Sequence, residues 1–462
     1  MRILEEIRKD GYFWLPTTPE NKIPGTLNIS KSGKVILEVI GLFESIPTPF
    51  TTPNKTIRIN GILENGNAVT LDQCSYKTQT IQAISKTTVS ALKCYLGTLY
   101  NANEEPLFSK VTFAIEGLDE WLAIRGISIK YGQGHQIDIT YKRPDDISIN
   151  LPDNLTLKLS FTWSGPSTNS ITEAKVTQKA LISLICTSPQ PIPYFSALLH
   201  KILNFFCFAI DESVHLTSLE GYSDSIVKKI GGTKSYPTPI SIYYSGLNSD
   251  KPAPRISNHD MLFTYSDVSS ELQKLLTNWL NNYDISAPAF NLYFAAKADA
   301  HAYLDGQFLS LAQGIETLHR RNSDGTIMPQ EEFQTILKTL SNTCPAERRN
   351  WLGVRLKYAN ELPLRERLLQ MLALFEQFYG NENERNAFAA KVVRTRNYLT
   401  HYDPSLKDAT DSPSTLWNLC QKLEALFQLH FLRLMGLTTD EMSILVKNNI
   451  SLQMKLKGGW GQ

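Results

Sequence analysis

Apolar and polar residues alternate in short runs through the first half of the chain. The clearest run is Leu155 to Phe161, in which every second residue is apolar. Alternation with a period of two is the pattern of a β-strand that buries one face. Ser32-Gly33 and Asn65-Gly66 have the chemistry of tight turns, and each stands between two such runs. The sequence therefore predicts two hairpins, 26–29 with 34–41 and 57–63 with 68–71.

Five further stretches of the first half have strand-like composition, and they cover 89–99, 107–116, 136–141, 155–163 and 173–185. Many short strands with turn residues between them predict an antiparallel sandwich or barrel. Between Tyr194 and Ile210 the apolar spacing becomes helical, which predicts a buried helix that covers the sheet. A second helix is predicted to open at Asp267 and to run to about Tyr283.

From Pro288 the apolar residues recur at helical spacing. Leu304, Phe308, Leu311, Ile315 and Leu318 step by four and three residues, which predicts one long helix from near Pro288 to Arg320-Arg321. Further helices are predicted over 329–340, 345–359, 364–379, from near 383 through 401, and from 413 to a stop at Gly436. Short connections between long amphipathic helices predict an antiparallel bundle. The expected fold class is α+β, with a mainly antiparallel β domain and its covering helices at 1–286 and an all-α bundle at 287–462.

Charge and composition limit the classes of function that the chain can have. The 462 residues carry a net charge of +1, so no global field attracts nucleic acid or a membrane. Any phosphate-binding surface must be local, and the basic groups are Arg320-Arg321, Arg348-Arg349 with Arg355 and Lys357, and the segment 385–396. The six cysteines are scattered without a zinc or redox motif, so no metal or cofactor is expected. No apolar run reaches the roughly 18 residues of a membrane span, which favours a soluble, cytoplasmic protein without a membrane partner.

One stretch combines the side chains that phosphodiester chemistry needs. Arg396 and Asn397 are adjacent, His401 follows five residues after the arginine, and Pro404 stands where a helix would stop. A fixed cation, a neutral amide and an imidazole together suit a phosphodiester without a metal. The alternative is structural, with Arg396 paired to a carboxylate such as Glu316 and the histidine at a helix C-terminus.

Helical geometry separates the arginine from the histidine. Five residues turn a regular helix through about 500°, so Arg396 and His401 point about 140° apart. Either the helix frays near Thr400, or the two side chains act from neighbouring sides of a cleft that a second subunit completes. Arg394 lies seven residues before His401 and only about 20° off its face. Arg396 is the preferred phosphate ligand because a polar residue follows it, and Arg394 is either its substitute or a further phosphate contact.

The segment from Arg396 to His401 in a late helix of a bundle resembles the HEPN superfamily. The hallmark of that superfamily is an arginine, four to six residues of which the first is polar, and then a histidine. The rest of the chain is similar to the ApeA-type branch of the superfamily. This similarity rests on Gly11-Tyr-Phe-Trp-Leu-Pro16, Pro24-Gly-Thr-Leu27, Gly117-Leu-Asp-Glu-Trp-Leu122 and Phe308-Leu-Ser-Leu-Ala-Gln-Gly-Ile-Glu-Thr-Leu-His-Arg-Arg321.

The resemblance implies an anti-phage defence effector that cuts RNA without a metal and shuts down infected cells by abortive infection. His401 is then the general acid or base, and Arg396 holds the scissile phosphate. Asn397 orients the histidine or a phosphate oxygen, and Arg394 and Glu316 are supporting candidates. The expected products carry 2′,3′-cyclic phosphate and 5′-hydroxyl ends. The implied partners are an RNA substrate (tRNA is one candidate), a second copy in a homodimer or larger homo-oligomer, and a phage-derived trigger at the N-terminal domain. The alternative is a catalytically inactive bundle that serves as a sensor or dimerisation scaffold.

Overall fold

The computed structural model describes residues 1–43, 57–167, 169–230, 234–246, 252–298, 303–323, 325–402, 405–406 and 412–458. The chain divides into two compact units, Met1–Gln273 and Lys274–Gln462, which are described separately. The boundary predicted between residues 286 and 287 lies inside helix α4 (Leu272–Lys297), and as a boundary between functional domains it stays a prediction.

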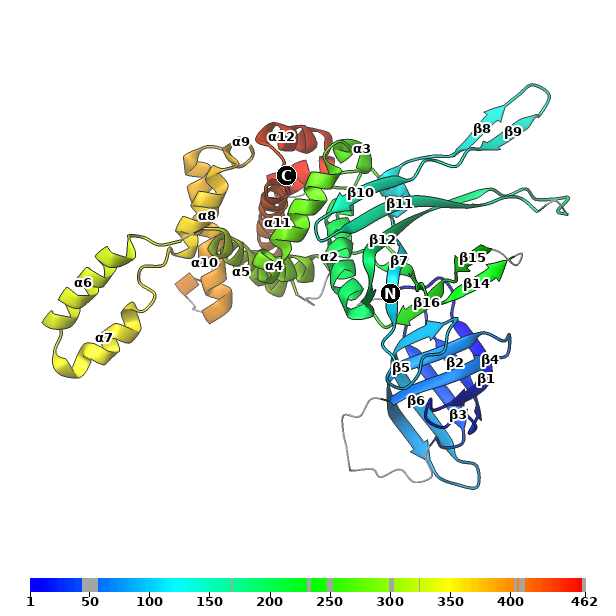
Figure 1. Ribbon diagram of the computed structural model, residues 1–462. Helices are drawn as coiled ribbons and strands as arrows, with labels where there is room; N and C mark the ends of the chain where they lie inside the picture. The colour runs from blue at the N-terminus through cyan, green and yellow to red at the C-terminus, as the bar shows by residue number, and fades with distance from the viewer. Residues whose placement is uncertain are drawn as a thin grey trace. The chain divides into compact units, whose positions relative to one another are not determined.

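Unit 1 contains a closed antiparallel barrel (Figure 1). Its wall follows the order β1-β2-β3-β6-β5-β4, and β4 pairs again with β1. Leu27, Leu37, Ile59 and Val89 are fully buried, as expected where alternate residues of each strand fill the interior. The prediction of a mainly antiparallel β domain is confirmed in its barrel form. The strands are β1 (Ile7–Trp14), β2 (Ile23–Ile29), β3 (Val35–Ile40), β4 (Ile57–Leu63), β5 (Ala68–Thr80) and β6 (Lys86–Leu96).

Both predicted hairpins form in this barrel. Gly33 and Gly66 have φ angles of 77° and 81°, in the left-handed region that a side chain disfavours. Each glycine lies in the turn between paired strands, Gly33 between β2 and β3 and Gly66 between β4 and β5. The turn chemistry thus predicts these two pairings correctly.

Strand β6 continues from the barrel into an open sheet. Residues 86–91 pair with β3, residues 93–96 pair with β16, and β5 runs along the other edge of the strand. The open sheet then follows the order β16-β13-β7-β12-β11-β10. Its strands are β7 (Leu107–Ile115), β10 (Ile147–Leu151), β11 (Leu155–Ser164), β12 (Thr177–Pro191), β13 (Leu216–Tyr222) and β16 (Ile240–Tyr244).

Helix α2 (Ile192–Ile210) is the predicted covering helix and packs on β7 and β12. Its length and composition alone would let it cross a membrane. Phe195, Ile202, Phe205 and Phe208 are nevertheless buried inside unit 1, so α2 packs as a core helix of this unit. The remaining elements of unit 1 are α1 (Leu118–Leu122), α3 (Tyr265–Val268), and two separate ribbons, β8 (Ile127–Tyr131) with β9 (Ile137–Tyr141) and β14 (Val227–Ile230) with β15 (Lys234–Pro237).

Unit 2 is helical, as predicted. Helix α5 packs on α8, α10 and α11, and α8 packs on α10. A side chain at Gly314 of α5 would meet the Phe427 ring of α11 at 2.6 Å, so the glycine permits close approach of α5 and α11. The helices after α4 are α5 (Leu304–Asn322), α6 (Gln330–Thr343), η1 (Ala346–Arg348), α7 (Arg349–Leu356), α8 (Leu364–Ala373), α9 (Glu376–Tyr379), α10 (Glu382–His401), α11 (Pro413–Met435), α12 (Thr439–Asn448) and α13 (Ile450–Lys457).

The prediction of one helix from near Pro288 to Arg321 is wrong. Pro288 lies inside α4, which ends at Lys297, and a separate helix begins at Leu304. Proline removes one helical hydrogen bond, but aromatic packing bridges the position. The Phe290 ring stacks on Tyr283 at 4.7 Å and meets Trp279 edge-on at 4.8 Å. These contacts hold the turns before and after Pro288 in one helix.

Candidate functional site

Helix α10 carries the predicted catalytic residues. Its first turn is fixed by a capping box, in which Asn381 accepts from the Glu384 amide and Glu384 accepts from the Asn381 amide. Ala389, Val392, Thr395 and Leu399 form its buried face. The helix runs without interruption through His401 and ends at Tyr402, whose φ of 50° is left-handed.

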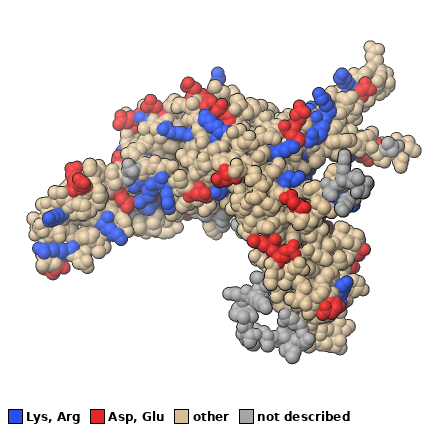
Figure 2. All heavy atoms as spheres, viewed as in Figure 1, with Lys and Arg blue, Asp and Glu red and all other residues tan. Residues whose placement is uncertain are grey.

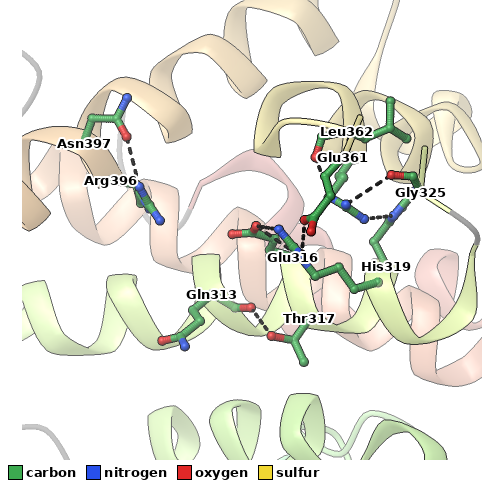
Figure 3. Close-up of polar contacts among 11 residues, drawn as sticks. Gln313, Glu316, Thr317, His319, Gly325, Glu361, Leu362, Arg396 and Asn397 are labelled. Carbon is green, nitrogen blue, oxygen red and sulfur yellow. Dashed lines mark hydrogen bonds and ion pairs between the residues drawn. The ribbon is translucent and has the colours of Figure 1, made fainter. Parts of the chain in front are cut away.

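Arg396 and Asn397 contact each other on the half-buried flank of α10. The Nη1 group of Arg396 donates to Oδ1 of Asn397 over 3.3 Å. In Figure 3 the guanidinium points from α10 toward the side of α5 that carries Gln313 and Glu316. In the part of the chain that the structure describes, Arg396 has no ion pair with a carboxylate. Its charge is therefore available to a ligand.

His401 lies apart from this pair, at the exposed C-terminal end of α10. Because the helix continues through Thr400, the fraying that could have turned the histidine toward Arg396 does not occur. The two residues keep their helical separation of about 140° and about 7.5 Å along the axis. Arg394 and His401 are both exposed, as their common face predicts. One copy of α10 thus presents its arginine–asparagine pair and its histidine in different directions.

Glu316 is engaged by a different arginine. Its Oε1 accepts from Nη2 of Arg320 over 3.0 Å, one helical turn further along α5. Arg320 also forms an ion pair with Glu361, which lies before α8. The structural alternative of an Arg396–Glu316 pair is not found, and Glu316 belongs to a cluster beside the base of the α6–α7 hairpin (Figure 3).

That hairpin is attached through a short two-stranded neck. Thr326 and Glu361 form an antiparallel bridge, and the Leu362 amide donates to the Gly325 carbonyl over 2.9 Å. Arg367 of α8 is 2% exposed and holds both strands. Its Nε donates to the Leu362 carbonyl over 2.8 Å, and its Nη2 donates to the Gly325 carbonyl over 3.3 Å. A buried guanidinium therefore fixes the base of the hairpin to the bundle.

His319 completes this clamp as a neutral imidazole. Its Nδ1 accepts from Nη1 of Arg367 over 3.1 Å, and its Nε2 lies 2.8 Å from Oε1 of Gln370, which can only accept. Burial, together with the nearby Arg367 charge, lowers the pKa of His319. Burial likewise lowers the pKa of His430 to about 3. Both histidines are buried packing groups and not exposed catalysts.

Sequence reasoning missed Arg367 and the neck that it holds. A signal exists, since Arg367 shares one face of α8 with Leu364, Leu368 and Met371. An arginine on an apolar face is rarely buried without a partner group. The sequence does not reveal that its partners are two backbone carbonyls and a histidine from other segments.

Replacing Arg367 with methionine is expected to loosen the neck. Hydrogen bonds to a charged group contribute about 1.5–3 kcal/mol each, so the Leu362 amide proton should exchange roughly 10- to 100-fold faster. Hydrogen exchange followed by mass spectrometry measures this, with the half-exposed Arg365→Gln of the same helix as the matched control. Equal exchange in the two variants contradicts the assigned role of Arg367.

Two protein-family models match the chain, one in each half. ApeA N-terminal domain 1 matches residues 8–279, and Apea-like HEPN matches residues 309–441, which include most of α5 and all of α8, α10 and α11. Neither the curated proteins nor the solved structures include a match to the chain. HEPN domains are generally related to ribonucleases.

The first of these matches covers more than half of the chain, and the chain belongs to the ApeA family. Both predicted halves of the architecture are confirmed in their order, the β-rich domain first and the HEPN bundle second. Membership of this family supports a role as an anti-phage defence effector.

Proposed function

We propose that the chain is a metal-independent endoribonuclease whose catalytic groups are Arg396, Asn397 and His401. The observation that carries this proposal is the Arg396–Asn397 contact on the helix that ends at an exposed His401. This helix lies inside the HEPN match, and Arg396 has no carboxylate partner among the described residues. A free guanidinium beside a neutral amide is suited to a phosphate.

The proposed chemistry uses the 2′-hydroxyl of the RNA as the nucleophile. An imidazole of His401 takes the proton of that hydroxyl, the O2′–P bond forms, and the P–O5′ bond breaks. The departing O5′ receives a proton from an imidazolium, which leaves a 2′,3′-cyclic phosphate and a 5′-hydroxyl. The guanidinium of Arg396 donates to the non-bridging oxygens as negative charge builds on them, and Asn397 holds the guanidinium in place.

The separation of the two groups on α10 supports a cleft built from two chains. A phosphate held by Arg396 of one chain lies on a different side of α10 from the His401 of that chain. A second copy related by two-fold symmetry can bring its own histidine to the first arginine. We therefore include a homodimer, or a larger homo-oligomer built on it, in the proposal.

The reaction is tested with purified protein and total bacterial RNA in excess EDTA. We expect cleavage to persist and the fragments to carry cyclic phosphate and 5′-hydroxyl ends. The assay is repeated with lysate from phage-infected cells, because the proposed role requires a silent enzyme before infection. Loss of cleavage in EDTA, or fragments with 3′-hydroxyl ends, contradicts the proposed chemistry.

Arg396→Ala is expected to reduce cleavage more than Arg394→Ala. Loss of one donor to a developing oxyanion costs roughly 10²- to 10³-fold in rate. Arg394 is exposed on the face of α10 that carries His401. As it would be a peripheral phosphate contact, its replacement should lower the cleavage rate less than tenfold. Single-turnover rates of the two variants and of the exposed Lys391→Ala decide this. A larger loss in Arg394→Ala would transfer the phosphate role to that residue.

The proposal gives unit 1 the task of receiving a phage-derived trigger, which rests on membership of the ApeA family. The second candidate function is an inactive bundle that acts as a sensor or scaffold. The near-neutral net charge of +1 favours it, because most nucleic-acid enzymes carry a basic excess. Cleavage that is absent with and without infected lysate would favour this second function.

A further inference from the structure

The α6–α7 hairpin stands away from the core helices of unit 2 beyond its neck (Figure 1). We call residues 326–361 the arm. Its helices pack on each other, and Phe333 is the one buried side chain of α6, while α7 has none. An element with so little core contributes little to the stability of the bundle. Its exposed side chains are therefore free to serve another purpose.

Cations and aromatic rings alternate along α7 and the residues that flank it. Trp351 and Arg355 lie one turn apart in α7. Arg348 is the N-cap residue of this helix, and Tyr358 follows its C-cap residue Lys357. Trp351 is 57% exposed and Tyr358 is 62% exposed. We call these four residues the α7 stripe. The segment 348–358 contains four cationic residues and no carboxylate.

The cations of the stripe differ from three other arginines of unit 2. Arg320, Arg365 and Arg385 each form an ion pair with a glutamate. In the described ranges, no ion pair engages Arg348 or Arg355. Figure 2 shows several basic side chains on the arm, with acidic ones beside them. Because Arg348 and Arg355 have no such ion pair among the described residues, their charges are open to an anionic partner.

We propose that the α7 stripe binds the single-stranded part of an RNA substrate. Unpaired bases can stack on Trp351 and Tyr358, and the guanidinium groups can take the adjoining phosphates. Duplex RNA hides its bases and offers the two aromatic rings no base on which to stack. This inference rests on the proposed function and narrows its substrate to RNA with an unpaired loop or end.

A second copy of the chain is a poorer occupant of the α7 stripe. In a two-fold contact the stripe would meet itself, so Arg348 and Arg355 would face identical cations. Like charges that lose water on contact cost several kcal/mol. A polyanion, by contrast, gains from every cation of the stripe and releases counterions as it binds.

The test measures RNA binding separately from cleavage. Every variant is made in a His401→Ala background, and the probes are fluorescein-labelled oligo(U) and a labelled duplex RNA of equal length, followed by anisotropy. Trp351→Ala is expected to weaken oligo(U) binding by roughly 5- to 150-fold, as loss of one stacked base does, and to spare the duplex. Arg348→Glu/Arg355→Glu should lower the salt slope by roughly 0.7 for each lost phosphate contact.

Matched controls lie outside the arm. Tyr303 is 80% exposed, and Lys447 of α12 is an exposed cation, so Tyr303→Ala and Lys447→Glu should leave oligo(U) binding unchanged. Equal binding in stripe and control variants overturns the proposal, as does wild-type protein that binds no oligo(U). A change of oligomeric state in the stripe variants, measured by light scattering, also overturns it and assigns the stripe to protein contact.

Different results would disprove the proposed RNA binding by the α7 stripe and the proposed nuclease activity. If wild type cleaves RNA and the stripe variants in an otherwise wild-type chain cleave with the same KM, the stripe is wrong and the nuclease stands. If no cleavage occurs but the stripe variants lose oligo(U) binding, the nuclease is wrong and the stripe stands. If both proposals are correct, the stripe variants should raise KM and leave kcat unchanged. The reason is that the stripe binds the RNA equally well in the ground state and in the transition state.

Discussion

Replacing His401 with alanine is expected to lower the rate of RNA cleavage by roughly 10²- to 10⁴-fold and to leave the fold of unit 2 intact. The loss follows from the proposed role of the imidazole, which takes and returns the proton in the reaction. The fold should survive because the side chain is exposed and has no hydrogen bond among the described residues. Single-turnover cleavage and thermal unfolding measure the two effects.

The control for this variant is His259→Ala, which removes another exposed histidine, in unit 1. We expect cleavage within twofold of wild type there. Two results would contradict the assignment of His401: an unchanged rate in His401→Ala, or an equal loss in both variants. A lowered melting temperature in His401→Ala alone would instead identify the residue as a helix C-terminal contact.

The largest expected effect on stability comes from Glu424 of α11. Its Oε1 accepts from Nζ of Lys297 over 3.0 Å and from Nζ of Lys455 over 2.6 Å, and the glutamate is 6% exposed. Glu424→Ala leaves two lysines in the interior without this carboxylate. Removing one partner of a buried ion pair costs about 3–5 kcal/mol. Urea unfolding followed by tryptophan fluorescence should show this loss.

The same cluster predicts an acid-sensitive bundle. Burial alone raises the pKa of Glu424, but the charges and hydrogen bonds of Lys297 and Lys455 outweigh burial and lower it from 4.5 to about 2. A carboxylate with a lowered folded-state pKa stabilises the fold fully above pH 4.5, and this stabilisation is lost as the pH falls toward 2. Glu424→Ala should therefore flatten the dependence of unfolding free energy on pH in this window.

Two further variants separate the ion cluster from simple loss of packing. Glu332→Ala removes an exposed carboxylate and should change the free energy of unfolding by less than about 0.5 kcal/mol. The triple variant Lys297→Met/Glu424→Leu/Lys455→Met should recover most of the stability that Glu424→Ala loses, because no buried charge remains. A triple variant no more stable than Glu424→Ala would mean that packing, and not charge, causes the loss.

Local chemistry allowed much of the fold to be predicted. The glycine turns at Gly33 and Gly66, the apolar helix α2 and the end of α11 at Gly436 all depend on residues close in sequence. Closure of the barrel could not be predicted, because it depends on β1 pairing with β4 and β3 pairing with β6, strands that are not neighbours in sequence. Alternation fixes which face of a strand is buried but not which strands meet.

The residues of the candidate site could be predicted from the sequence, but only part of their arrangement in space could be. The adjacency of Arg396 and Asn397 follows from the sequence, whereas the half-buried position of Arg396 depends on how α10 packs on α5. The pairing of Glu316 with Arg320 was within reach, because a spacing of four residues puts the two side chains together on a helix. The continuity of α4 through Pro288 could not be predicted from the sequence, because the packing of three aromatic rings decides it.

The sharing of β6 between the barrel and the open sheet limits how the chain can tolerate insertions. A single extra residue inside β6 would turn every later side chain of the strand to the opposite face. The insertion would affect two sheets, because Val89 pairs with β3 in the barrel and Tyr95 pairs with β16 in the open sheet. One codon added there would misalign both sheets at once, so relatives of this chain should vary in length at their loops and keep β6 constant in length.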